Sequence, residues 1–128
     1  MGDVSVDVNV ADGLLVTGSE SELASVLRNL LHNAARHAVS SVVVAAAARD
    51  GTVVITVDDD GPGIPPAERQ RVFQRFARLE HARSRADGGV GLGLAVVDRV
   101  VRHHNGSVEV TDSPAAGARF QVILPRAQ

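Results

Sequence analysis

Cysteine, tryptophan, tyrosine and lysine are all missing from this chain of 128 residues. Without cysteine the chain has no disulfide and no thiolate metal site, which fits a reducing compartment such as the cytoplasm. Three Phe are the only aromatic residues, so there are few platforms on which the bases of a single-stranded nucleic acid could stack. The formal charge of -2 gives no general attraction to DNA or to an anionic membrane. We therefore expect no nucleic-acid partner and no direct membrane contact.

The absence of lysine excludes two large classes of phosphate-binding protein. All 13 basic residues are arginine. Walker-type loops need a Gly-Lys-Ser/Thr step, and eukaryotic-type protein kinases need a strand lysine on the phosphates. Neither class fits this sequence.

No apolar stretch is long enough to span a bilayer; Val42 to Ala48 is typical of the longest. Hydrophobic residues make up 45% of the chain, enough for a core built from Val, Leu, Ile and Ala. No internal repeat or linker is visible. We therefore expect residues 1–128 to form one soluble domain.

Alternating and helical apolar patterns divide the chain into strands and helices. A strand at Val4 to Val10 is expected to turn at Asp12-Gly13 into a hairpin with Leu14 to Val16. Ser19 or Ser21 would cap a helix ending near Ala38, with Glu22 in capping-box register to Ser19. The remaining predictions are strands at 41–48 and 52–57, irregular structure at 58–66, a short helix at 67–76, a loop at 77–89, a helix at 91–104 and strands at 107–111 and 119–124.

These elements predict the fold class. Strands and helices interleave, but several strand pairs are hairpins, so the sheet should be mixed and covered by helices on one face. An α/β two-layer sandwich follows.

Polar residues gather on one flank of the first predicted helix. At 100° per residue, Asn29, Asn33 and Arg36 lie together, away from the centre of the apolar stripe. An Asn oxygen can bind Mg²⁺, and the amide and guanidinium can bind phosphate oxygens. An ordinary solvated helix face is the alternative.

A carboxylate and two glycines follow the predicted strand at 52–57. Asp58-Asp59-Asp60 precedes Gly61-Pro62-Gly63-Ile64. A carboxylate at a strand end can accept a hydrogen bond from an exocyclic amine, and glycine lets a flat base approach the backbone. Simple turn punctuation is the alternative, and a calcium loop lacks the required spacing and terminal Glu.

A glycine run opens the second long helix. Gly89-Val90-Gly91-Leu92-Gly93-Leu94 would place free N–H groups and the positive end of the helix dipole near phosphate. A Rossmann fingerprint fails because Leu94 replaces its last glycine and a loop precedes it. A flexible glycine hinge is the remaining alternative.

Between these patches, Phe73 and Phe76 are more typical of a core, and Arg78 and Arg83 are candidates to close over phosphates.

Taken in order, these patches resemble the catalytic, ATP-binding domain of bacterial sensor histidine kinases, within the superfamily that includes gyrase, mismatch-repair and chaperone ATPases. The resemblance extends from Leu23 to Pro125. Its four motifs are similar to the N box at Asn29 to Asn33, the first glycine box at Asp59 to Ile64, the F box at Phe73 to Phe76 and the second glycine box at Gly89 to Leu94.

The resemblance implies a Bergerat-type ATP-binding fold and a role for each motif. Asn33 would hold Mg²⁺, Asn29 and Arg36 would line the phosphate side, and Asp59 would receive the adenine amine. The base would lie beside His37, Gly61, Gly63 and Ile64, although His37 stands where the family usually has an aromatic residue. Gly89, Val90, Gly91, Leu92, Gly93 and Leu94 would hold the polyphosphate beneath a lid at 77–88. Val90 and Ala118 each stand where the family commonly has Thr.

The resemblance also implies the reaction. Relatives that hydrolyse ATP or phosphorylate Ser carry Glu at the place of Asn29, and an amide is no general base at neutral pH. We expect transfer to histidine, with an ATPase, an anti-sigma-type Ser kinase or a non-catalytic nucleotide-binding module as alternatives. The phosphoacceptor motif of the family is a His followed by an acidic residue and, shortly after, a basic residue and Pro. None of the five His stands in such a sequence. The expected partners are ATP, a separate dimerisation and phosphoacceptor domain and a response regulator. The chain itself is expected to be a monomeric, cytoplasmic C-terminal fragment of a membrane sensor in a two-component system.

Overall fold

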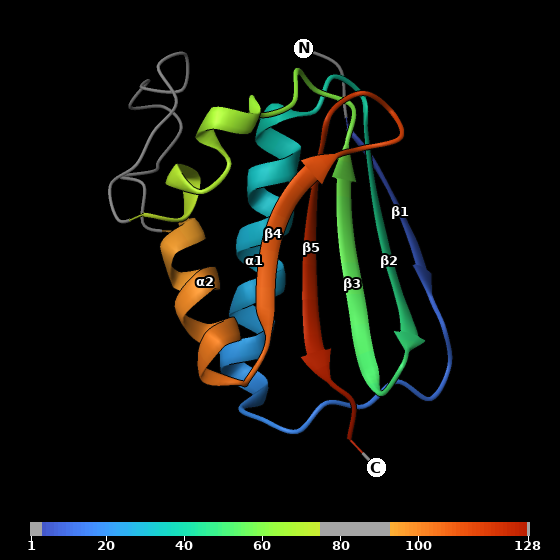
Figure 1. Cartoon of the computed structure of the whole chain (residues 1–128). Helices are drawn as coiled ribbons and strands as arrows, with labels where there is room; N and C mark the ends of the chain where they lie inside the picture. The colour runs from blue at the N-terminus through green and yellow to red at the C-terminus, as the bar shows by residue number, and fades with distance from the viewer. Residues whose placement is uncertain (1–3, 75–92, 128) are drawn as a thin grey trace.

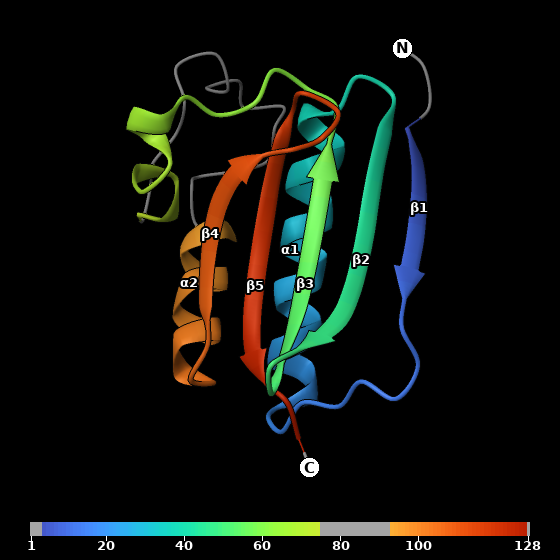
Figure 2. The same cartoon turned by 45° about the vertical axis from the view of Figure 1, so that its right-hand side comes forward.

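The computed structural model describes residues 4–74 and 93–127 (Figure 1). In this part of the chain a five-stranded sheet has the order β1-β2-β3-β5-β4, with both long helices on one face (Figure 2). The predicted α/β two-layer sandwich is confirmed. Its elements are β1 Ser5–Val10, α1 Glu20–His37, β2 Ser41–Arg49, β3 Thr52–Asp59, the 3-10 turns η1 Pro66–Glu68 and η2 Arg71–Phe73, α2 Gly93–His103, β4 Ser107–Asp112 and β5 Ala118–Pro125.

The predicted hairpin between the first strand and Leu14 to Val16 is wrong. β1 pairs in parallel with β2, from Ser5 opposite Ser41 to Val10 opposite Ala46, and α1 forms the crossover. The turn glycine is present, since Gly13 has φ 76°. The backbone beyond it bonds to the C-terminal segment instead, because Leu15 O accepts from Ala127 N at 2.7 Å. The chain therefore enters a βαβ unit.

β1 is also more exposed than the alternation of its valines predicts. Val6, Val8 and Val10 lie opposite Val42, Val44 and Ala46, on the helix side of the sheet. They are nevertheless 50%, 62% and 55% exposed. α1 packs over β2 and β3, so the edge strand extends beyond its cover.

Ser19 is the N-cap of α1, and its Oγ accepts from Glu22 N at 3.3 Å. A complete capping box would bring the Glu22 side chain back to the backbone N–H of Ser19. That N–H donates instead to Nε2 of His104, at 3.1 Å. The start of α1 is thus joined to the end of α2.

The predicted turn at Asp50-Gly51 is confirmed, with φ of 51° and 80°. β3 continues two residues beyond the predicted strand, because Asp58 and Asp59 still pair with β2.

The predicted short helix at 67–76 is wrong where the structure describes it. Only i to i+3 bonds form there, as in Gln74 N to Arg71 O at 3.0 Å, and they give the two 3-10 turns η1 and η2.

The core lies between the sheet and the two helices and contains little aromatic surface. Phe120 is fully buried, and its ring meets that of Phe73 edge-on with centroids 6.0 Å apart. Among the described residues no helix is both long and apolar enough to cross a bilayer. The largest fully buried side chains are Phe120, Leu30, Val42, Val57, Val97, Val101 and Val122.

Candidate nucleotide site

A small pocket opens where the end of α1, the end of β3 and the start of β5 meet, at the upper end of the sheet in Figure 1. It combines one carboxylate and one imidazole with apolar walls. These are the features expected of a site for a flat, weakly polar ring. Its lining residues are His37, Asp59, Pro62, Gly63, Ile64, Ala118 and Phe120.

Asp59 is 2% exposed, and two backbone donors fix its orientation. Its Oδ1 accepts from Gly61 N at 2.9 Å and from Ala118 N at 3.2 Å. Both bonds that described residues make to this side chain end on Oδ1. Oδ2 is therefore the oxygen that can accept a hydrogen bond from a bound ligand.

Two glycines bring the pocket walls together by lacking a side chain. A Cβ on Gly61 would overlap the carbonyl oxygen of His37. A Cβ on Gly117 would overlap the carbonyl oxygen and Oδ1 of Asp59. Helix α1, the β3 end and the β4–β5 turn can meet at this pocket only because these positions are glycine.

We expect Gly117→Ala to destabilise the domain by about 2 kcal/mol, because the added methyl group would displace backbone as well as the Asp59 side chain. Gly117 lies outside the left-handed region, so the effect is steric. Gly13→Ala is the matched control, since Gly13 has φ +76° and no atom within 4 Å of a Cβ. It should show only the cost of backbone strain, about 1 kcal/mol. Urea unfolding followed by circular dichroism measures both, and equal losses would contradict the steric explanation.

A row of polar groups runs from this pocket along α1. Asn33 lies one turn before His37, and Asn29 one turn before Asn33. Asn29 donates through Nδ2 to Ser25 O at 2.8 Å. A Cβ on Gly93 would lie 3.0 Å from Asn29 Oδ1, so the start of α2 meets the far end of this row. From His37 to Asn29 the helix rises about 12 Å, close to the reach of a nucleoside polyphosphate.

Asn33 carries a buried amide nitrogen whose hydrogen bonds a ligand could complete. The residue is 7% exposed, and within the described ranges its buried Nδ2 has no hydrogen-bond partner. Such a group is costly unless something binds to it. This burial rules out the solvated helix face as an account of Asn33.

The donors around Asn33 fit Mg²⁺ that is shared with phosphates. In the parts of the chain that the structure describes, no three His, Asp or Glu residues come together as a metal site. Mg²⁺ is usually bound through one or two protein oxygens together with substrate phosphates and water. A half-turn of the Asn33 amide would present its oxygen where the unpartnered nitrogen now lies. Asn33 therefore suits that role.

The other predicted site residues divide into three groups. Arg36 is exposed on α1. Leu94 packs against the core, so its side chain stabilises the start of α2. The predicted residues outside the described ranges are Arg78, Arg83, Gly89, Val90, Gly91 and Leu92.

The sequence patterns missed three contributors to the pocket. Pro62 and Phe120 line it, and Gly117 packs against Asp59. Phe120 has the alternating spacing of a core strand, which gave no reason to place it beside a ligand. Gly117 is indistinguishable in sequence from an ordinary turn glycine. Ala118, noted in the sequence only as a departure from the family pattern, contributes both a wall and an N–H.

Comparison with known proteins agrees with this architecture. The profile of the family described as "Histidine kinase-, DNA gyrase B-, and HSP90-like ATPase" matches residues 18–128. The sensor histidine kinase CpxA of Escherichia coli K12 is 42% identical over 108 residues, which are 84% of this chain and 24% of CpxA. The sensor-like histidine kinase SenX3 of Mycolicibacterium smegmatis is 38% identical over 124 residues, 95% of this chain and 32% of SenX3. The chain thus spans a quarter to a third of these relatives.

Solved structures are similar over almost the whole chain. The mycobacterial sensor histidine kinase MprB superposes with a TM-score of 0.84 at 35% identity, covering 97% of this chain and 83% of that one. Full-length ShkA, in a complex with AMPPNP, gives a TM-score of 0.83 at 30% identity and covers 98% of this chain and 26% of that one. This chain belongs to the histidine kinase-, DNA gyrase B- and HSP90-like ATPase family, as an ATP-binding catalytic domain of the sensor histidine kinase type.

Proposed function

We propose that this domain binds Mg-ATP and transfers the γ-phosphoryl group to a histidine on a separate dimerisation domain. The observation that carries the proposal is the row formed by the Asp59 pocket, the buried amide of Asn33 and the meeting of Asn29 with the start of α2. A base, a metal and a polyphosphate need these groups in this order. The AMPPNP named with the related ShkA structure supports the ligand class.

At the base end, Asp59 Oδ2 would accept from the adenine amino group. Gly63, Ile64 and Phe120 would cover the ring, and His37 would close the side nearest to α1. The buried carboxylate makes this bond selective, because a base with a carbonyl at that position would leave Asp59 unpaired.

At the phosphate end, the start of α2 supplies the positive end of a helix dipole beside Asn29. Arg36 would add positive charge next to Asn33. We propose that Gly89 to Leu92, with Arg78 and Arg83, complete this end as the family resemblance implies. Mg²⁺ held by Asn33 would neutralise phosphate charge when bound.

The protein groups at this end orient the nucleotide and do not activate water. Asn29 has an amide where a hydrolase of the superfamily has Glu, and its Nδ2 is already bonded to Ser25. In the proposed transfer an imidazole nitrogen of the acceptor attacks the γ-phosphorus. The bond from that phosphorus to the bridging oxygen breaks, ADP leaves with the electron pair, and the other imidazole nitrogen loses its proton to water. Positioning and charge neutralisation are sufficient for such a step.

The relatives' names support a proposal for the partners and the setting of this domain. CpxA and SenX3 are sensor histidine kinases and are much longer than this chain. We propose a dimerisation domain as phosphoacceptor, a response regulator downstream, a cytoplasmic position within a membrane sensor, and a monomeric state for this domain alone.

Phosphotransfer can be tested by mixing the domain with the acceptor domain of its parent protein and γ-labelled ATP. Acid-labile, base-stable label on the acceptor histidine is expected. A domain that binds ATP but leaves the acceptor unlabelled would contradict the kinase proposal. Phosphate released by the domain alone would favour an ATPase.

Replacing Asn33 by Ala should remove most of the advantage that Mg²⁺ gives to nucleotide binding. We expect the ratio of the ADP dissociation constants without and with Mg²⁺ to fall roughly tenfold, because loss of a metal partner typically has this effect. His32→Ala is the matched control, since His32 is the exposed neighbour on the same helix. Calorimetric titration with and without EDTA measures the ratio, and an unchanged ratio in Asn33→Ala would remove Asn33 from the metal site.

A further inference from the structure

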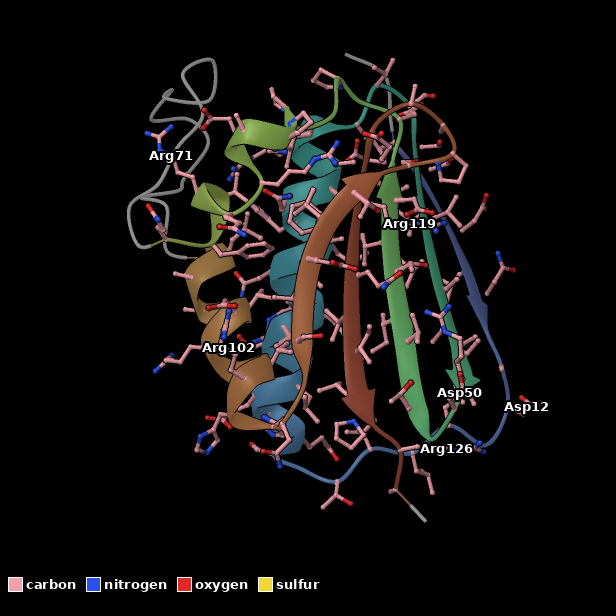
Figure 3. All side chains as sticks on the ribbon, viewed as in Figure 1. Asp12, Asp50, Arg71, Arg102, Arg119 and Arg126 are labelled. Atoms are coloured by element: carbon pink, nitrogen blue, oxygen red, sulfur yellow. The ribbon has the colours of Figure 1, made fainter. Side chains whose placement is uncertain are left out.

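Three consecutive aspartates at the end of β3 form three unrelated sets of contacts. Asp58 lies on the face of the sheet opposite α1 and α2 and forms a bidentate pair with Arg119, at 2.7 and 2.8 Å (Figure 3). This hydrogen bond raises the pKa of Arg119. Asp59 faces the base pocket. Asp60 turns to a third segment, the loop between α1 and β2, and the proposed nucleotide chemistry gives it no role.

The carboxylate of Asp60 binds a run of three backbone N–H groups. Oδ1 accepts from Val39 N at 2.8 Å, Ser40 N at 3.0 Å and Ser41 N at 3.2 Å. Oδ2 accepts from Ser40 Oγ at 2.8 Å. These donors, the backbone N–H of Ser40 first among them, hold the pKa of Asp60 well below its ordinary value of 3.8. The side chain is therefore ionised at neutral pH and firmly held.

This loop joins the two walls of the base pocket. Residues 38–40 directly follow His37, which lines the pocket from α1. Asp60 directly follows Asp59, which lines it from β3. The carbonyl of His37 also lies against Gly61, on the other side of Asp60. The bonds of Asp60 thus fix the end of α1 relative to the end of β3.

We propose that Asp60 is a positioning residue for nucleotide binding, which sets the separation of the His37 and Asp59 walls without touching the ligand. The inference rests on the proposed function, because it assigns the base to this pocket. The β2–β3 ladder holds the strands but stops at Val42 opposite Asp59. The end of α1 lies beyond that ladder, so side-chain bonds from Asp60 reach the segment that the ladder does not. Without these bonds the end of α1 would be held less firmly. A binding site whose supporting contacts are loose is expected to bind its ligand substantially more weakly.

The test is the affinity for ADP and for adenosine, measured by calorimetry at 10 °C on samples shown by circular dichroism to be folded. We expect Asp60→Ala to weaken binding of both ligands by about tenfold, because adenosine probes the base pocket without the phosphates. Asp60→Asn should restore the affinity to within about threefold of the wild type, since its amide can accept from the backbone donors and donate to Ser40 Oγ.

Asp12→Ala is the matched control, because Asp12 is an exposed carboxylate in a loop at the opposite end of the sheet (Figure 3). It should bind like the wild type. If Asp60→Ala is not folded at 10 °C, Ser40→Ala takes its place, since it removes only the hydroxyl contact to Oδ2. ADP affinity within twofold of the wild type, or weaker ADP binding with unchanged adenosine binding, would overturn the inference. A wild-type domain that binds neither ligand would instead overturn the proposed function.

Discussion

Asp59→Asn is expected to weaken ADP binding by roughly 100-fold, from the loss of a charged hydrogen bond and the introduction of an opposing donor. The geometry fixes how the new amide must lie. Gly61 N and Ala118 N both point at Oδ1, so the amide oxygen has to remain there. The NH₂ group then takes the place of Oδ2. It would face the adenine amino group donor to donor, and neither could bond.

Calorimetric titration of ADP measures this effect, and the loss should persist in EDTA because the contact is to the base. Asp98→Asn is the control, since Asp98 forms an exposed ion pair with Arg102 on α2 at 2.8 Å (Figure 3). Such pairs contribute little, so this variant should bind like the wild type. Asp59→Asn that binds ADP within threefold of the wild type would show that the base lies elsewhere.

The pocket around Asp59 shows which parts of a site can be predicted from sequence patterns. Asp59 and Gly63 were recognisable because a carboxylate and glycines interrupt an apolar strand pattern in a way that core packing does not require. His37 and Ile64 were predicted from the resemblance to sensor histidine kinases. All four residues line one pocket. Their assignment to a nucleotide stays a prediction that the titrations above address.

Two of the residues that were missed, Gly117 and Phe120, act through long-range contacts. Gly117 is 58 positions from Asp59, and its packing against that residue depends on how β5 pairs with β3. Nothing local distinguishes it from the turn glycine Gly13. Phe120 alternates with Val122 and Leu124 like any core strand residue, and only the sheet order brings it to the pocket.

The failed hairpin has the same cause. Asp12-Gly13 is a good turn signal, and Gly13 does adopt a positive φ. The strand that pairs with β1 is nevertheless β2, which begins 31 residues after β1 ends, across the α1 crossover. Local turn chemistry predicted the bend correctly but could not predict which strand would pair with β1.

Phe120→Ala is expected to destabilise the domain by about 3–5 kcal/mol, the usual range for removing a buried aromatic ring. Phe120 is fully buried, so its replacement by Ala would leave a cavity between the sheet and the helices. Its edge-on contact with Phe73 also joins the sheet to η2, and that contact would be lost. Because the ring lines the base pocket, ADP affinity should fall in the same variant.

Urea unfolding followed by far-ultraviolet circular dichroism is the suitable measurement, since the chain has no Trp or Tyr to report by fluorescence. Phe120→Leu is the control: it keeps an apolar side chain in place and should cost about 1.5 kcal/mol or less. The two variants separate packing from recognition, because a ring that only fills the core would let Phe120→Leu bind ADP normally. If Phe120→Leu instead loses ADP affinity while keeping most of its stability, the ring contacts the base directly, and the pocket, the core and β5 share one residue.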